Sequence, residues 1–274
     1  MTGPLFTELR RALDADEPVV LATVTDRSDG AGHATALAAK LVVRPGAPLL
    51  GTLGDQELDR VVARDALAAL DRGMTVTRHY GPHGEARRED VAVFLEVFVR
   101  RARLVIFGAV DFTRALVEVG HVLGYVVTVC DARPVFATED RFPLADEVVV
   151  DWPDRYLARV GSDLGPRDAV CVLTHDAKFD LPAIMGALAT RVGYLGAMGS
   201  RRTHEERWKR LLDAGASEPE LRGRLMSPIG LDLGARTPEE TAVSIFAEII
   251  AVRTGRASEP LGPLRDGSGS IHAR

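Results

Sequence analysis

The stretch that decides the fold is residues 104–130, LVIFGAVDFTRALVEVGHVLGYVVTVC. Two unbroken apolar runs, residues 104–107 and 126–130, frame a segment at 112–123 whose apolar spacing suits a helix. Unbroken apolar strands are typical of a parallel sheet that is covered on both faces. A strand, a helix and a second strand in this order predict the first unit of a doubly wound α/β fold.

The same alternation continues toward the C-terminus. Further strands are predicted at 147–150, 170–173 and 192–195, and helices at about 156–160, 181–189, 203–213 and 238–253. The last helix has a clear start, because Thr237, Pro238 and Glu240 match a capping box with proline at the first helical position. We therefore expect a Rossmann-like, doubly wound parallel sheet over residues 101–254. Residues 255–274 are rich in Gly, Ser and Pro, and we expect a disordered tail there.

The sequence of residues 1–100 predicts a smaller N-terminal α/β domain. Strands are expected at 18–25, 40–44, 49–53 and 91–99, helices at 5–13 and 58–70, and a polar loop at 78–90. The basic stretch 100–103 separates two apolar strands, so we place the domain boundary there. Asp55, Glu57 and Asp59 are expected to lie in the first turn of a helix, where its dipole favours negative charge.

Composition excludes several classes of protein. The formal net charge of −5 argues against broad nucleic-acid binding, which needs a basic face. No apolar run reaches the roughly 18 residues of a membrane span, and residues 1–11 lack the apolar core of a signal peptide, so we expect a cytoplasmic protein with no membrane partner. Cys130 and Cys171 lie in apolar strands and predict buried, inert thiols; no Cys/His spacing resembles a zinc site.

The turn after the first strand of the second domain departs from the dinucleotide pattern G-x-G-x-x-G. It reads GAVDFT at residues 108–113, and only Gly108 remains. Val110 places a Cβ, and Asp111 a negative charge, where a pyrophosphate would lie, so NAD(P) binding is disfavoured and Asp111 suits a helix cap. Asp131 ends the next strand, where an acidic residue either binds a ribose hydroxyl or serves in a turn; both interpretations stay open.

Two polar clusters follow the later strands. Thr174, His175 and Asp176 come directly after one strand, and the loop GAMGSRR at 196–202 follows the next. Ligands of open parallel sheets bind outside the carboxyl ends of the strands, and glycines with a helix start favour an anion. Arginines can add charge-assisted contacts. The alternative is a solvated basic turn, and if Thr203 is the helix cap, both arginines lie in the loop.

A third loop, residues 227–236, joins the last two predicted helices and contains Asp232. It is apolar and rich in glycine. Such a loop either packs against another part of the protein or serves as a plain connector.

Three of these segments together resemble a known family. They are THD at 174–176, GYLGAMGSRRTHEER at 193–207 and SPIGLDLGARTPEETAVSIFAEIIA at 227–251. They closely resemble the XdhC/CoxI family of xanthine dehydrogenase and carbon monoxide dehydrogenase accessory factors, over about residues 103–254. In the first domain VVLATVT, GTLGDQELD and VFLEVFV occur in the family's order with weaker similarity.

The resemblance implies an accessory factor for a molybdenum hydroxylase such as xanthine dehydrogenase. Such a chaperone binds molybdenum cofactor (molybdopterin) transiently and assists its sulfuration or insertion, and is not itself a turnover enzyme. Its expected partners are the apo-hydroxylase, a cysteine desulfurase and further copies of itself. Taking the loops and the resemblance together, the candidate cofactor-binding residues are Gly108, Asp131, Thr174, His175, Asp176, Gly196, Gly199, Ser200, Arg201, Arg202 and Asp232.

This chain also departs from the family. Many relatives have GAGHVG in place of GAVDFT, and a glycine-glycine-cysteine segment in place of Asp55-Gln56-Glu57. The missing cysteine removes a thiolate that could contact molybdenum, which argues against direct metal ligation. Two alternatives remain: a nucleotide-dependent oxidoreductase and a nucleotide-sensing regulatory module.

Overall fold

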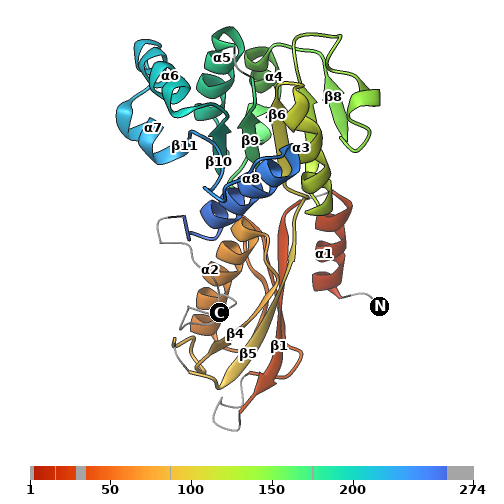
Figure 1. Ribbon diagram of the computed structural model, residues 1–274. Coiled ribbons are helices and arrows are strands. Elements are labelled where there is room, and N and C mark those ends of the chain that lie inside the picture. The colour runs from red at the N-terminus through yellow and green to blue at the C-terminus, as the bar shows by residue number, and fades with distance from the viewer. Residues whose placement is uncertain (1–2, 16, 29–34, 87, 175, 258–274) are drawn as a thin grey trace. The chain divides into compact units, whose positions relative to one another are not determined.

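The computed structural model describes residues 3–15, 17–28, 35–86, 88–174 and 176–257. The chain divides into two compact units, one ending at Arg100 and the other beginning at Arg101 (Figure 1). Among the described residues, no helix combines the length and the hydropathy that crossing a bilayer would require. Most of the predicted tail, residues 258–274, lies outside the described residues.

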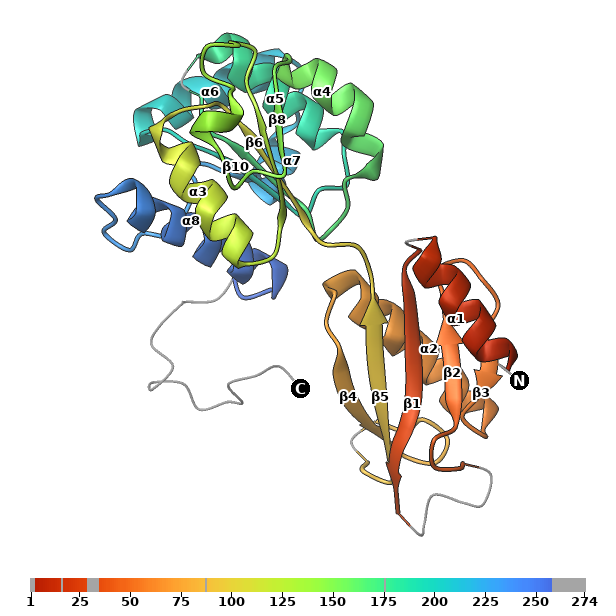
Figure 2. The ribbon, with the colours of Figure 1, turned by 90° about the vertical axis from the view of Figure 1, so that its right-hand side faces the viewer.

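The first unit is an antiparallel sheet with the strand order β3-β2-β1-β5-β4. Its strands are β1 (Val19–Arg27), β2 (Lys40–Val43), β3 (Leu50–Thr52), β4 (Val76–Tyr80) and β5 (Val91–Phe98). Its helices are α1 (Pro4–Asp14) and α2 (Gln56–Arg72). The helices α1 and α2 lie on opposite faces of this sheet (Figure 2). Side chains alternate along β1, so Val20 and Ala22 pack toward α2 whereas Val19 packs toward α1.

One predicted loop of this unit is partly wrong. Residues 78–80 belong to β4, which pairs antiparallel with β5 from Val76 opposite Leu95 to Tyr80 opposite Val91. The local sequence is polar, but Tyr80 is buried against the core of the unit. The pairing with β5 thus overrides the weak local signal.

The second unit is a parallel sheet with the strand order β11-β10-β9-β6-β7-β8. Its strands are β6 (Arg103–Phe107), β7 (Val126–Cys130), β8 (Glu147–Val149), β9 (Ala169–Val172), β10 (Tyr194–Ala197) and β11 (Leu225–Met226). Its α-helices are α3 (Asp111–Val122), α4 (Pro153–Val160), α5 (Ala177–Leu188), α6 (Arg201–Asp213), α7 (Glu218–Arg224) and α8 (Pro238–Arg253). The short helices η1 (Glu139–Arg141) and η2 (Gly161–Asp163) complete it.

Helices cover both faces of this sheet, which confirms the doubly wound α/β prediction (Figure 1). Along β6, Leu104 and Ile106 pack with α3 and α8, whereas Val105 and Phe107 pack with α4 and α5. The helix α8 has the predicted bounds. The short elements α7 and β11 were not predicted, because seven and two residues give too little periodicity to read.

The strand order also fixes where a ligand crevice can form. The chain runs outward from β6 through β7 to β8 and then returns to β9 on the other side of β6. The connections after β6 and β9 therefore leave in opposite directions at the carboxyl edge. Open α/β sheets bind their ligands at such a switch point.

Candidate functional site

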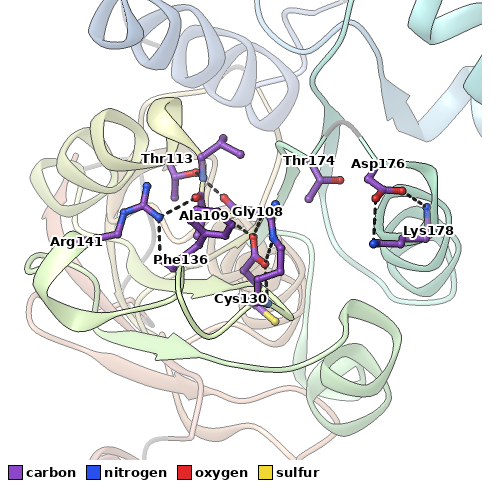
Figure 3. Close-up of polar contacts among 12 residues, drawn as sticks. Gly108, Ala109, Thr113, Cys130, Phe136, Arg141, Thr174, Asp176 and Lys178 are labelled. Atoms are coloured by element: carbon purple, nitrogen blue, oxygen red, sulfur yellow. Dashed lines mark hydrogen bonds and ion pairs between the residues drawn. The ribbon is translucent and has the colours of Figure 1, made fainter.

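The loops after β6 and β9 touch at this switch point. Gly108 has a φ of +111°, a backbone conformation that residues other than glycine rarely adopt. A Cβ added to it would lie 2.8 Å from Thr174 Cγ2 and 3.0 Å from the Thr174 backbone nitrogen. The structure thus brings together two of the predicted site residues, and a glycine is required for their contact (Figure 3).

Three consecutive backbone N–H groups of the β6–α3 turn, those of residues 108–110, donate within the protein. Gly108 N–H donates to Cys130 O at 2.9 Å and Ala109 N–H to Asp131 Oδ2 at 2.8 Å. Val110 N–H donates to Thr113 Oγ1 at 3.1 Å, and the same hydroxyl donates to Gly108 O (Figure 3). A pyrophosphate approaching here would have to displace these internal contacts.

The predicted cap of α3 is wrong by one residue. Val110 is the cap, and Asp111 is the first helical residue. Val110 has no polar side chain to accept from the helix, and the Thr113 hydroxyl accepts from the Val110 N–H in the opposite direction. The exposed Asp111 keeps a negative charge in the first turn, where the helix dipole favours it.

Asp131 faces inward, and its side chain is only 2% exposed. It accepts hydrogen bonds from Ala109 N–H and from Arg133, through the backbone N–H at 2.9 Å, Nε at 2.9 Å and Nη2 at 2.7 Å. Burial alone would raise the pKa of Asp131, but the hydrogen bonds from Arg133 and Ala109 outweigh it and lower that pKa. The carboxylate therefore ties two loops together and is not presented as a free ribose acceptor.

Arg133 and Arg141 connect the β6–α3 turn to Phe136. The Arg133 guanidinium lies 4.5 Å from the centroid of the Phe136 ring. Arg141 Nη1 donates to Ala109 O at 3.2 Å and to Phe136 O at 3.0 Å (Figure 3). These contacts further hold the β6–α3 turn in place.

The polar cluster after β9 separates into a buried and an exposed part. Thr174 is buried, and its hydroxyl donates to Asp180 of α5. Asp176 is exposed and caps α5, accepting from Lys178 N–H at 3.1 Å and pairing with Lys178 Nζ at 3.2 Å (Figure 3). The Lys178 N–H, followed by its ammonium group, lowers the pKa of Asp176. His175 lies outside the described residues.

Gly196 of β10 and Gly199 of the β10–α6 connection have packing roles. Gly196 is buried within β10, and a Cβ added there would lie 2.5 Å from Ile229 Cδ1. A Cβ at Gly199 would lie 3.1 Å from the Thr203 side chain. Both glycines thus permit a close approach, in each case by a neighbouring side chain of the protein itself.

Ser200 is the cap of α6, and its Oγ accepts from Thr203 N–H at 3.1 Å. The alternative in which Thr203 is the cap is therefore wrong. Arg201 and Arg202 are the first two helical residues and are exposed. Arg202 is 88% exposed and pairs with Glu206 at 3.2 Å, whereas no carboxylate in the described part of the chain pairs with Arg201. The first amides of a helix have no acceptor within the helix, so this turn combines unpaired donors with cationic side chains.

The loop after β11 packs at its start and is exposed later. Ile229 N–H donates to Ala197 O at 3.1 Å, and Gly230 N–H donates to Glu248 Oε2 at 2.8 Å. Asp232 and the residues that follow it are exposed or half-buried. The packing expected from the apolar start of this loop is therefore present, and among the described residues Asp232 has no contact that would give it a role.

A buried ion pair lies beneath these loops and was missed from the sequence. Arg207 of α6 pairs with Asp180 of α5 at 2.8 Å, and the two side chains are 3% and 5% exposed. The one available signal is spacing: Arg207 lies one helical turn before Leu211, a buried residue of the same helix. That spacing predicts an inward position for Arg207, although the many charged residues around it suggest an exposed helix face.

Neither thiol of the chain is available as a ligand. Cys130 and Cys171 are buried and unbridged, as predicted. Burial raises the pKa of Cys130 to about 12 and raises that of Cys171 further. No group of three or more His, Cys, Asp or Glu side chains among the described residues could hold a metal ion.

Comparison with known proteins identifies the family. Residues 104–249 match the XdhC Rossmann domain, and residues 12–81 match the XdhC and CoxI family. The chain belongs to the XdhC/CoxI family. The matched segments cover most of both units described above.

Individual relatives agree with this assignment. A protein of Bacillus subtilis (strain 168) that is named as a probable xanthine dehydrogenase subunit is 34% identical over 65% of this chain and 50% of its own length. "Molybdenum cofactor insertion chaperone PaoD" of Escherichia coli (strain K12) is 34% identical over 36% of this chain and 31% of its own length. The chain spans half or less of the length of these relatives.

A solved structure has the same fold. It is described as a xanthine dehydrogenase from Bacillus halodurans and matches with a TM-score of 0.51. The match has 21% sequence identity and covers 93% of this chain and 97% of that one. At this identity the likeness concerns the fold alone.

Proposed function

We propose that this chain is an accessory factor of a molybdenum hydroxylase that binds molybdenum cofactor as cargo and assists its sulfuration or its insertion. The observation that carries the proposal is the β10–α6 turn. Its exposed Arg201 and Arg202 lie at a helix start, at the carboxyl edge of the sheet. Such a turn suits a phosphate group, which molybdopterin carries. The name of the PaoD relative supports the same cargo.

The donor set fits the phosphate end of the cofactor and not the metal end. Both cysteines are buried with raised pKa values, so the thiolate form that binds metals is disfavoured. We therefore assign Ser200 and Arg201 to holding the phosphate, with Thr174 and Asp176 near the same edge. No residue of this chain is assigned as a molybdenum ligand.

The proposed partners are an apo molybdenum hydroxylase as recipient, a cysteine desulfurase as sulfur source and a second copy of this chain. The alternatives are a nucleotide-dependent oxidoreductase and a nucleotide-sensing module. The β6–α3 turn argues against a dinucleotide in its usual pose, since its three amides already donate within the protein.

Calorimetric titration of purified molybdopterin into wild type and Arg201→Ala, at two salt concentrations, tests the proposal. We expect wild type to bind, the variant to bind more weakly, and the difference to shrink as salt screens the contact. NADP⁺ and GDP titrated in parallel represent the alternatives. Tight binding of either nucleotide with no binding of molybdopterin would overturn the proposal.

A further inference from the structure

One buried guanidinium group contacts two loops of the candidate site directly and a third through Asp180. Arg207 Nη2 donates to Met198 O in the loop after β10, at 2.7 Å, and to Asp180 Oδ2, at 2.8 Å. Arg207 Nη1 donates to Ser227 Oγ in the loop after β11, at 3.1 Å. The other oxygen of Asp180 accepts from Thr174 Oγ1 in the loop after β9.

We infer that Arg207 is a positioning residue of this site. Through Asp180 and Met198 it fixes where Thr174 stands relative to the turn that carries Ser200 and Arg201. The role in ligand binding rests on the proposed function, in which this edge holds a phosphate-bearing pterin. The role in ordering the loops stands on the contacts alone.

Packing between α5 and α6 does not require this pair. Moving two charges out of water is costly, and apolar side chains of similar volume often hold two helices as well or better. Arg207 Nε is also buried and finds no acceptor among the described residues, which adds to that cost. An arginine buried at this cost points to a geometric role, because a planar guanidinium directs hydrogen bonds to fixed positions.

The positioning role depends on the two terminal nitrogens of the guanidinium, which form a planar fork of hydrogen-bond donors. One nitrogen reaches both Met198 O and Asp180, and the other reaches Ser227, so the three acceptors are held at set angles. A lysine would keep the charge but present a single ammonium group. Gly199 lies over this fork, since a Cβ there would be 3.5 Å from Arg207 Nη1. The guanidinium therefore also supports the turn that precedes Arg201.

The test compares wild type with Arg207→Lys and with the apolar double variant Asp180→Leu/Arg207→Met. The matched control is Glu218→Leu/Arg222→Met, which removes an exposed ion pair of α7. Each protein is examined for its melting temperature, for amide hydrogen exchange at Thr174 and residues 198–200, and for molybdopterin binding. We expect the apolar double variant to stay folded, to exchange those amides at least tenfold faster, and to bind molybdopterin at least tenfold more weakly.

Arg207→Lys should show the same two changes in smaller degree, and the control should show neither. Unchanged exchange at these amides in a folded double variant would overturn the positioning role, whatever the ligand result. Faster exchange with unchanged molybdopterin binding would overturn its link to the ligand. If wild type does not bind molybdopterin, the proposed function fails, and the exchange data still decide the positioning role. If the double variant does not fold, amide exchange and molybdopterin binding are compared between wild type and Arg207→Lys instead.

Discussion

Two turns of the parallel sheet, β6–α3 and β10–α6, have the same position in the fold but differ in how far their polar groups are hydrogen-bonded within the protein. Each joins a buried strand to a helix at the carboxyl edge, and each contains a glycine that a neighbouring threonine approaches closely. In the β6–α3 turn the amides of Gly108, Ala109 and Val110 donate within the protein. In the β10–α6 turn the arginines are exposed. Under the proposed function, the engaged amides of the first turn and the exposed arginines of the second favour the second turn as the anion site.

Each turn is also supported by an aspartate paired with an arginine. Asp131 holds Arg133, whose side chain is 42% exposed, beneath the first turn. Asp180 holds Arg207, which is buried, beneath the second. The first pair can lose its arginine to solvent, whereas the second cannot, so removing one partner should have different costs at the two places.

The largest expected effect is that of Arg207→Leu. It removes the guanidinium that faces the buried Asp180 carboxylate, and the free energy of unfolding should fall by about 3–5 kcal/mol. Denaturant unfolding followed by circular dichroism measures this change. Arg222→Leu, which removes an exposed arginine, should stay within about 0.5 kcal/mol of wild type. Equal stability of the two variants would show that the buried Arg207–Asp180 pair matters no more to the fold than the exposed Arg222–Glu218 pair.

Asp131→Ala should come next. It removes the acceptor of the buried Ala109 N–H and the partner of Arg133, so stability should fall by about 2–3 kcal/mol. Molybdopterin affinity should not change, because Asp131 supports the β6–α3 turn, to which the proposed function assigns no phosphate contact. Thermal unfolding and a titration with the cofactor measure the two quantities. Weakened binding in a folded variant would place the β6–α3 turn in the site.

Arg201→Ala should reduce molybdopterin affinity by about 1.5–3 kcal/mol, the range for a hydrogen bond to a charged group. This corresponds to roughly a tenfold to hundredfold rise in dissociation constant. Arg202→Ala should have a smaller effect, because Arg202 already pairs with Glu206. Both variants should keep wild-type stability within about 0.5 kcal/mol. Equal affinity in all three proteins would show that neither arginine contacts the phosphate of molybdopterin.

The lowered pKa of Asp131 predicts a smaller, pH-dependent effect. A carboxyl group with a depressed folded-state pKa stabilises the fold above its unfolded pKa, near about 3.9, and that contribution is lost as the pH falls through the lower folded value. The stability difference between wild type and Asp131→Asn should therefore shrink below about pH 4. Denaturant titrations at about pH 7 and about pH 3 measure it. A difference that grows on acidification would contradict the assigned direction.

The smallest expected effect is that of Val110→Gly. Restoring a glycine leaves the turn's N–H groups engaged, so NADP⁺ at about 1 mM should still stabilise the variant by less than about 0.4 kcal/mol, the value for a dissociation constant of about 1 mM. Differential scanning calorimetry with and without the nucleotide measures this. A clear gain in the variant would show that the side chain, and not the engaged amides, excludes the dinucleotide.

Much of the fold was predictable because its signals are local. The apolar runs at β6, β7 and β9 and the capping box of α8 each lie within a few residues of the element they specify. Signals that depend on a distant partner were missed. β4 is polar and forms because β5 offers it an edge, and β11 is only two residues long beside β10.

The candidate site divides in the same way. The sequence alone determined which loops are glycine-rich and basic, that both cysteines lie in buried strands, and that the first turn lacks the dinucleotide pattern. Only the tertiary structure decided that Asp131 faces inward, that Ser200 caps α6 and that Arg207 joins three loops. For Asp131 and Arg207 the physical reason is that their hydrogen bonds reach other segments of the chain, Ala109 in the first case and Asp180, Met198 and Ser227 in the second. The cap of α6 is a local choice between Ser200 and Thr203, and the backbone conformation decides it. A local sequence pattern does not identify the distant hydrogen-bond partners of Asp131 and Arg207.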